Sequence, residues 1–347
     1  MKSSTLNVFC CVAGMILAAS GVGLSQIATT DPVGFITLNV AGTGGASAEA
    51  LSFKGLGLTR LVEYQGIAEA VGASSVTDND ANWTEGQFNG ANGEYYLEII
   101  SGAGAGRTYD IATTTAATKT ITLTENLTGI TAPVSFKIRK HWTIGAVFGP
   151  NNEAGLGGGA PGEADEILIF NPATGAFQTY YYKVGGIGGD GWRNASTGAV
   201  ASTQKIYPDD GLLMKRRQSA NANVVLIGAV KTGQTSIPVF KGLNFLGNVY
   251  AANMTLTSSG LYTGNSATGV AGGAPGEADE VLIYNQGSKG YITYFYKVGG
   301  LGGNGWRNAT DGTDAANVSI PVGSSIVVRR KAATSFDWIA PQHPAAL

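Results

Sequence analysis

Acidic side chains are concentrated at two places in the sequence. Three carboxylates stand within Glu163–Glu166, and the arrangement recurs in Glu277–Glu280. Carboxylate oxygens at this density are typical Ca²⁺ ligands, and paired carboxylates are also the catalytic groups of glycoside hydrolysis. On a strand, however, adjacent side chains point to opposite faces, which opposes a joint site. We favour a structural role over calcium, and calcium over catalysis. The candidate metal ligands are Glu163, Asp165, Glu277 and Asp279.

Paired basic residues supply the structural alternative. An apolar run ends in adjacent arginines in two places, once after Leu212 and once after Ile326. We expect one carboxylate of each acidic cluster to form an ion pair with this basic edge. The candidate edge residues are Arg216, Arg217, Arg329 and Arg330.

Two tryptophans, Trp192 and Trp306, stand in identical Gly-Trp-Arg-Asn-Ala contexts, with Tyr182 and Tyr296 ten residues before them. An exposed tryptophan beside tyrosine would form a platform on which a sugar ring stacks. Large aromatic side chains are more often buried in small β-domains, so we favour core packing over glycan stacking for all four residues.

The glycine-rich passages Gly186–Gly191 and Gly300–Gly305 fit the pattern G-x-G-x-x-G. A nucleotide site would need a helix to begin at the last glycine, and neither passage has one in its sequence pattern. We predict hairpin loops instead. His141 is the one reasonable candidate for a general base, and we interpret it as structural, so no catalytic residue is assigned.

These motifs occur twice because the chain contains an internal duplication. Of the 39 residues aligned from Gly158 to Ser196 and from Gly272 to Thr310, 26 are identical at a constant offset of 114. A period of this length indicates two copies of a whole folding unit. Repeating a unit favours a binding or building module over an enzyme.

The surrounding elements are predicted to be strands. Fifty-two glycines and short β-branched or aromatic runs favour an all-β fold, an N-terminal antiparallel meander or barrel followed by two tandem β-sandwich-like units. Only Leu61–Val71 has apolar spacing suited to one short helix. The predicted divisions are residues 1–28 as signal peptide, 29–140 as N-terminal β domain, and 141–230 and 231–347 as repeat units.

The composition limits the function. Lys2 followed by the apolar run Val8–Leu17 predicts a signal peptide, and nothing after it resembles a transmembrane segment. Both cysteines lie in that segment, so we expect no disulfide, catalytic thiol or cysteine-bound metal in the mature protein. With 13% charged residues and a net charge of −2, the chain offers no field that would recruit nucleic acid.

The segment from Thr30 to Phe35 reads TDPVGF. It resembles the opening of the mature chains in an uncharacterised family of secreted bacterial proteins. Tyr96–Ile99, the two Ala-Asp-Glu strands and the closing run Ile326–Arg330 before Trp338 share that resemblance. The resemblance implies secretion and carries no known activity.

We therefore predict a secreted, non-enzymatic structural or adhesive protein of the bacterial cell surface, extracellular matrix or periplasm. Its partners would be a cell-envelope protein or polysaccharide, or further copies of itself. The alternative is a glycan-binding, lectin-like module assisted by calcium. No other cofactor is expected.

Overall fold

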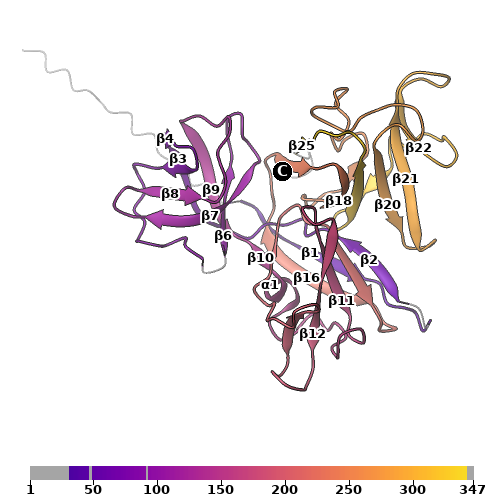
Figure 1. The fold of residues 1–347 in the computed structure, drawn as a ribbon, viewed down its shortest axis with the longest axis horizontal. Coiled ribbons are helices and arrows are strands. Elements are labelled where there is room, and N and C mark those ends of the chain that lie inside the picture. The colour runs from indigo at the N-terminus through magenta and orange to yellow at the C-terminus, as the bar shows by residue number, and fades with distance from the viewer. Residues whose placement is uncertain (1–30, 47–48, 91–92, 342–347) are drawn as a thin grey trace, which may run out of the picture. The chain divides into compact units, whose positions relative to one another are not determined.

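The computed structural model describes residues 31–46, 49–90 and 93–341. The predicted signal peptide lies outside the described residues. Nearly all regular structure is antiparallel β, which confirms the predicted all-β class (Figure 1). One short helix, α1 (Ile144–Phe148), is capped by the Thr143 hydroxyl, which accepts from the Ala146 amide at 3.1 Å.

A seven-stranded sheet occupies residues 62–140, in the strand order β3-β9-β6-β7-β8-β5-β4. The predicted meander is present in β6 to β8, which are neighbours in this order. The strands are β3 (Val62–Ala68), β4 (Ala70–Val71), β5 (Ser75–Thr77), β6 (Tyr95–Ile99), β7 (Thr108–Thr115), β8 (Thr120–Leu123) and β9 (Val134–Lys140). Residues 59–141 are called the seven-stranded domain below. It has its own core, which includes Leu97, Phe136 and Ile138.

The short helix predicted within Leu61–Val71 is wrong. This segment forms β3 and β4, because its backbone pairs with β9 on one side and β5 on the other. Gly66 interrupts any helical pattern, and the sheet provides the burial that an isolated helix would lack.

The duplicated sequences form two five-stranded sheets with the same order. The first is β13-β12-β11-β15-β2 and the second β22-β21-β20-β24-β18. The first contains β2 (Ala50–Lys54), β11 (Glu166–Asn171), β12 (Ala176–Lys183), β13 (Gly191–Asn194) and β15 (Leu212–Arg216). The second contains β18 (Gly242–Gly247), β20 (Glu280–Asn285), β21 (Gly290–Lys297), β22 (Gly305–Asn308) and β24 (Ser325–Arg330).

Two-stranded ribbons accompany each sheet. The first set is β1 (Val33–Val40) with β16 (Ala222–Ala229), and β10 (Trp142–Thr143) with β14 (Lys205–Ile206). The second set is β17 (Thr235–Val239) with β25 (Phe336–Ala340), and β19 (Met254–Thr255) with β23 (Ser319–Ile320).

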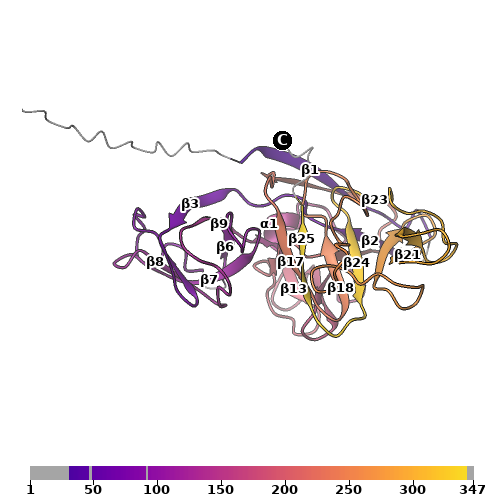
Figure 2. The same ribbon diagram turned by 90° about the horizontal axis from the view of Figure 1, so that it is seen from above.

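The pairing of β1 and β2 groups the chain differently from the sequence-based division. Both strands precede the seven-stranded domain, yet they pair with β16 and β15, and their surroundings contribute Leu38 and Leu56 to the core that contains Trp192. Residues 31–58 and 142–230 are therefore called the first unit, and residues 231–341 the second unit. In chain order, the seven-stranded domain interrupts the first unit. β2 also contacts β24 of the second unit (Figure 2).

Candidate functional site

The acidic strand starts are occupied by arginine. Asp165 Oδ2 accepts from Arg216 Nη1 at 2.5 Å and from the Gly157 amide at 2.7 Å, while Oδ1 accepts from the Arg217 amide at 2.7 Å. Asp279 is held in the same way, with Arg330 Nη1 at 2.6 Å and the Ala271 amide at 2.7 Å. The expected ion pairs are therefore present in both units.

These positions offer few free carboxylate oxygens to a calcium ion. The buried aspartates already face an arginine, whereas Glu163 and Glu277 are exposed on the preceding turns. Nowhere in the described part of the chain do three or more His, Cys, Asp or Glu side chains gather in a way that could hold a metal. The four predicted metal ligands are thus not brought together as a site.

Of the four arginines of the basic edge, two are buried and two are at least partly exposed to solvent. Arg216 and Arg330 are buried with their aspartates. Outside them, Arg217 Nη2 lies 3.1 Å from Glu166 Oε1 and 2.7 Å from Glu49 Oε1, and Arg329 Nη1 lies 2.8 Å from Glu280 Oε2. All four arginines therefore form their ion pairs within the chain. The buried Arg216 and Arg330 are not accessible to a partner.

The two tryptophans weighed as a sugar-stacking platform pack in the core, as favoured from the sequence, with Tyr182 buried and Tyr296 half-buried beside them. Trp192 and Trp306 are 1% and 3% exposed, and Trp192 Nε1 donates to the Gly149 carbonyl at 2.8 Å. The ring of Tyr182 meets that of Trp192 edge-on at 5.3 Å, and Tyr296 meets Trp306 at 5.6 Å. Neither indole offers a face to a sugar, so glycan stacking at these tryptophans is ruled out by burial.

The glycine-rich loops are exposed and ordered by hydrogen bonds. In the first unit, Lys183 Nζ donates to the Ile187 carbonyl, Arg193 Nη2 donates to the Gly188 carbonyl at 2.7 Å, and Asp190 Oδ1 accepts from the Gly185 amide at 2.6 Å.

The loop of the second unit repeats this arrangement. Lys297 Nζ donates to the Leu301 carbonyl, Arg307 Nη2 donates to Gly302 at 2.9 Å, and Asn304 takes the place of the aspartate at 2.7 Å from the Gly299 amide. Each loop thus holds one aliphatic side chain in solvent, with Ile187 100% and Leu301 97% exposed.

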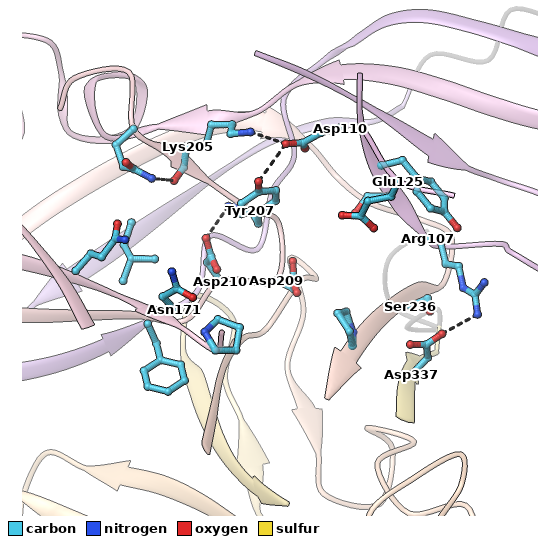
Figure 3. Close-up of a pocket in the computed structure, with 18 of the residues that line it drawn as sticks. Arg107, Asp110, Glu125, Asn171, Lys205, Tyr207, Asp209, Asp210, Ser236 and Asp337 are labelled. Carbon is cyan, nitrogen blue, oxygen red and sulfur yellow. Dashed lines mark hydrogen bonds and ion pairs between the residues drawn. The ribbon is translucent and has the colours of Figure 1, made fainter. Parts of the chain in front are cut away.

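A cleft of about 630 Å³ is bordered by the seven-stranded domain and by both units (Figure 3). Asp110 is its best-connected residue. Its Oδ1 lies 2.8 Å from His141 Nε2, and its Oδ2 accepts from Lys205 Nζ and from the Tyr207 hydroxyl, the latter at 3.1 Å. Burial raises the pKa of Asp110, but hydrogen bonds from His141 and Lys205 outweigh it and lower the pKa to about 2. Asp110 is therefore ionised at neutral pH.

Asp209 and Asp210 border the same cleft, and their pKa values are shifted in the opposite direction to that of Asp110. Burial, and then the neighbouring charge of Asp209, raise the pKa of Asp210 to about 8, and burial also raises the pKa of Asp209. Asp210 Oδ2 accepts from the Tyr207 amide at 2.7 Å. The two adjacent carboxyls therefore take up a proton more readily than isolated aspartates do.

Sequence reasoning missed this cleft, since its residues come from segments far apart in the chain. The sequence nevertheless contained a signal for the cleft, because the two copies of the duplicated unit differ at residues that border it. At the offset of 114, the charged or aromatic residues Lys205, Tyr207, Asp209 and Asp210 stand opposite Ser319, Pro321, Gly323 and Ser324. His141 was singled out in the sequence, and the structure gives it a role in orienting Asp110.

No protein-family model, curated protein or solved structure matches the chain. Among the described residues, no helix is long and apolar enough to cross a membrane.

Proposed function

We propose that this protein is a secreted, non-enzymatic structural or adhesive component of the cell envelope or extracellular matrix, and that its two glycine-rich loops are its contact surfaces. The observation that carries the proposal is the pair of almost fully exposed side chains, Ile187 and Leu301, held by equivalent hydrogen bonds in the two units.

The loops combine exposure with order, which favours a recognition role. Val184 and Val298, just before the glycines, are also exposed, so a second aliphatic side chain is accessible near each loop. The carbonyls of Ile187 and Leu301 are fixed by the lysines of the adjoining strands. The loop conformation is therefore already fixed in the folded protein, and a partner that binds it causes little further loss of conformational entropy.

Two loops with exposed aliphatic side chains in one chain suit adhesion or assembly. Burying a fully exposed isoleucine or leucine contributes roughly 2 kcal/mol, which gives only weak binding at one loop. When both loops engage the same envelope or the same assembly, the second contact is intramolecular and the avidity rises by roughly 10²-fold or more.

Introducing a charge at the exposed loop side chains tests the proposal. The purified chain from Thr29 onward would be compared with Ile187→Asp, Leu301→Asp and the double variant, by sedimentation velocity for self-assembly and by co-sedimentation with isolated bacterial envelopes. We expect each single variant to weaken association and the double variant to abolish it. Leu61→Asp, at an exposed leucine outside the loops, is the matched control.

Retention of the fold would be checked by circular dichroism. Association of the double variant at the level of the unchanged protein would overturn the role of the loops. A wild-type protein that neither assembles nor sediments with envelopes would overturn the proposed function itself.

A further inference from the structure

The cleft has no part in the two-loop contact, and its chemistry points elsewhere. We propose that it is a binding site for a neutral, polyhydroxylated ligand, namely a segment of a carbohydrate chain. The inference goes beyond the proposed function, because it assigns a second site made by different residues.

The charges of the lining argue against an anionic ligand. Its two cationic side chains are already paired, Arg107 with Asp337 at 2.8 Å and Lys205 with Asp110. The carboxyls of Asp209, Asp210 and Glu125 have no cationic partner within the described ranges. A phosphate, a nucleic acid or an acidic polysaccharide would therefore find no unpaired cation among the lining residues.

The lining also argues against a lipid or other apolar ligand. The apolar residues of the lining are Ile169, Phe170, Pro172 and Pro238, beside the rings of Tyr109 and Tyr207, and all the other lining residues are polar or charged. Asn171, Gln178 and Gln204 also line the cleft. Each of their amides makes a hydrogen bond within the chain and keeps further donor and acceptor capacity. Hydroxyl groups, which also donate and accept, are suited to such a surface.

Tyr207 supplies an aromatic surface in a fixed position. The residue is 38% exposed, and its hydroxyl lies 3.1 Å from Asp110 Oδ2. The His141 ring meets its ring edge-on at 5.0 Å, and Lys205 Nζ lies over the ring at 5.4 Å from its centroid. Sugar rings present C–H groups that pack on such a surface while their hydroxyls reach the neighbouring amides and carboxyls. Asp210 lies beside this ring, with its Oδ2 accepting from the Tyr207 amide at 2.7 Å.

The second unit shows that the fold does not require these side chains. The turn at Tyr207–Asp210 closes through the Asp210 amide and the Tyr207 carbonyl at 3.1 Å. The equivalent turn closes through the Ser324 amide and the Pro321 carbonyl at 3.2 Å, without an aromatic ring or a carboxylate. The substituted residues are therefore available for a role that only the first unit has.

The matched variant follows from this comparison. Asp209→Gly combined with Asp210→Ser gives the first unit the turn residues of the second, and Tyr207→Leu removes the aromatic surface. The purified chain from Thr29 onward would be screened on a glycan array. It would then be titrated by calorimetry with cellohexaose, mannohexaose, laminarihexaose, xylohexaose and chitohexaose, and with polygalacturonate and hexalysine as charged comparisons.

We expect saturable binding of at least one neutral oligosaccharide, weakened about tenfold or more in each cleft variant, as loss of one or two hydrogen bonds would produce. The Ile187→Asp and Leu301→Asp double variant should bind the same sugar as the unchanged protein does. This separates failure of the cleft proposal from failure of the loop proposal.

Several results would overturn the proposal. These are no binding of any neutral glycan, binding of hexalysine or polygalacturonate alone, and sugar binding that persists in both cleft variants. If the double cleft variant does not fold, Asp209→Asn, which keeps the size of the side chain and removes its charge, takes its place in the same titration.

Discussion

The rings of Phe53 and Phe245 are stacked, with centroids 6.5 Å apart and planes inclined by 16°. The two residues occupy equivalent positions on β2 and β18, since Phe53 pairs with Leu213 on β15 and Phe245 pairs with Val327 on β24, 114 positions further along. Each unit therefore meets the other through the same residue.

The contacts around this stack are reciprocal. Phe53 packs on Tyr284 and Tyr291 of the second unit at 4.8 and 5.2 Å. Phe245 packs on the equivalent pair in the first unit, Phe170 and Phe177, at 4.8 and 4.7 Å. This reciprocity is the pattern of a two-fold symmetric dimer interface, here formed within one chain.

The backbone follows the same reciprocity. The Gly55 amide donates to the Gly323 carbonyl at 3.3 Å, and the Gly247 amide donates to the Asp209 carbonyl at 2.8 Å. A Cβ on Gly55 would lie 2.6 Å from the Ser324 carbonyl oxygen, so only glycine allows this approach of the two units.

Phe53→Ala should lower the free energy of unfolding by about 3 kcal/mol, because it removes a buried ring from between three others. Phe53→Leu keeps most of the apolar volume and should cost less than about 1.5 kcal/mol. Urea denaturation followed by tryptophan fluorescence measures both. Equal stability of the alanine variant and the unchanged protein would show that the stack does not hold the units together.

The buried ion pair gives a second prediction. Asp279 and Arg330 are fully buried, whereas Glu280 pairs with Arg329, whose side chain is 48% exposed. Asp279→Ala leaves a buried guanidinium and two backbone amides without their acceptor, so we expect a loss of about 4 kcal/mol. Glu280→Ala should cost at most about 1 kcal/mol. Similar midpoints for the two variants in urea would contradict this difference.

Much of this architecture could be predicted from sequence because the underlying signals are local. The short β-branched or aromatic runs and the glycines between them indicated strands, and strands make up nearly all of the regular structure. The ion pairs with Arg216 and Arg330 were predictable because the acidic and basic groups recur together at the same offset.

The rest depends on pairing between distant segments. Phe53 and Phe245 stand 192 positions apart, whereas Phe177 and Tyr291 stand 114 apart, because the seven-stranded domain separates β2 from the remainder of the first unit. No constant offset could therefore relate β2 to β18. The cleft was hidden for the same reason, as Asp110 and Lys205 meet across 95 positions.

A third prediction concerns Asp31. Its Oδ1 lies 2.5 Å from Lys137 Nζ, and its Oδ2 accepts from Arg139, which also donates to Glu98 at 3.2 Å from its Nε. Burial raises the pKa of Asp31, but the hydrogen bonds from Lys137 and Arg139 lower it below its usual value. This network ties the start of the first unit to β9.

Asp31→Asn should therefore lower the free energy of unfolding by about 3 kcal/mol, since it leaves the buried Arg139 with only part of its counter-charge. The control is Asp80→Asn, at an exposed aspartate of the seven-stranded domain. Chemical denaturation at pH 7 measures both variants. If the two midpoints coincide, the network does not stabilise the fold.

The last prediction concerns acid. Asp110 has a pKa of about 2 in the folded protein, below the ordinary value of 3.8, because hydrogen bonds from His141 and Lys205 outweigh burial. A carboxylate whose pKa is lowered by folding stabilises the protein at pH values above its unfolded pKa, and this stabilisation is lost as the pH falls through the folded pKa. The contribution is about 2 kcal/mol, fully present above roughly pH 5 and lost towards pH 2.

Asp110→Asn removes the titrating group, and the other carboxylates are common to both proteins. The difference in unfolding free energy between the unchanged protein and Asp110→Asn should therefore shrink by about 2 kcal/mol between pH 6 and pH 2. Urea titrations at a series of pH values across this range measure the difference directly. A difference that stays constant with pH would mean that His141, Lys205 and Tyr207 do not hold Asp110 in its ionised form.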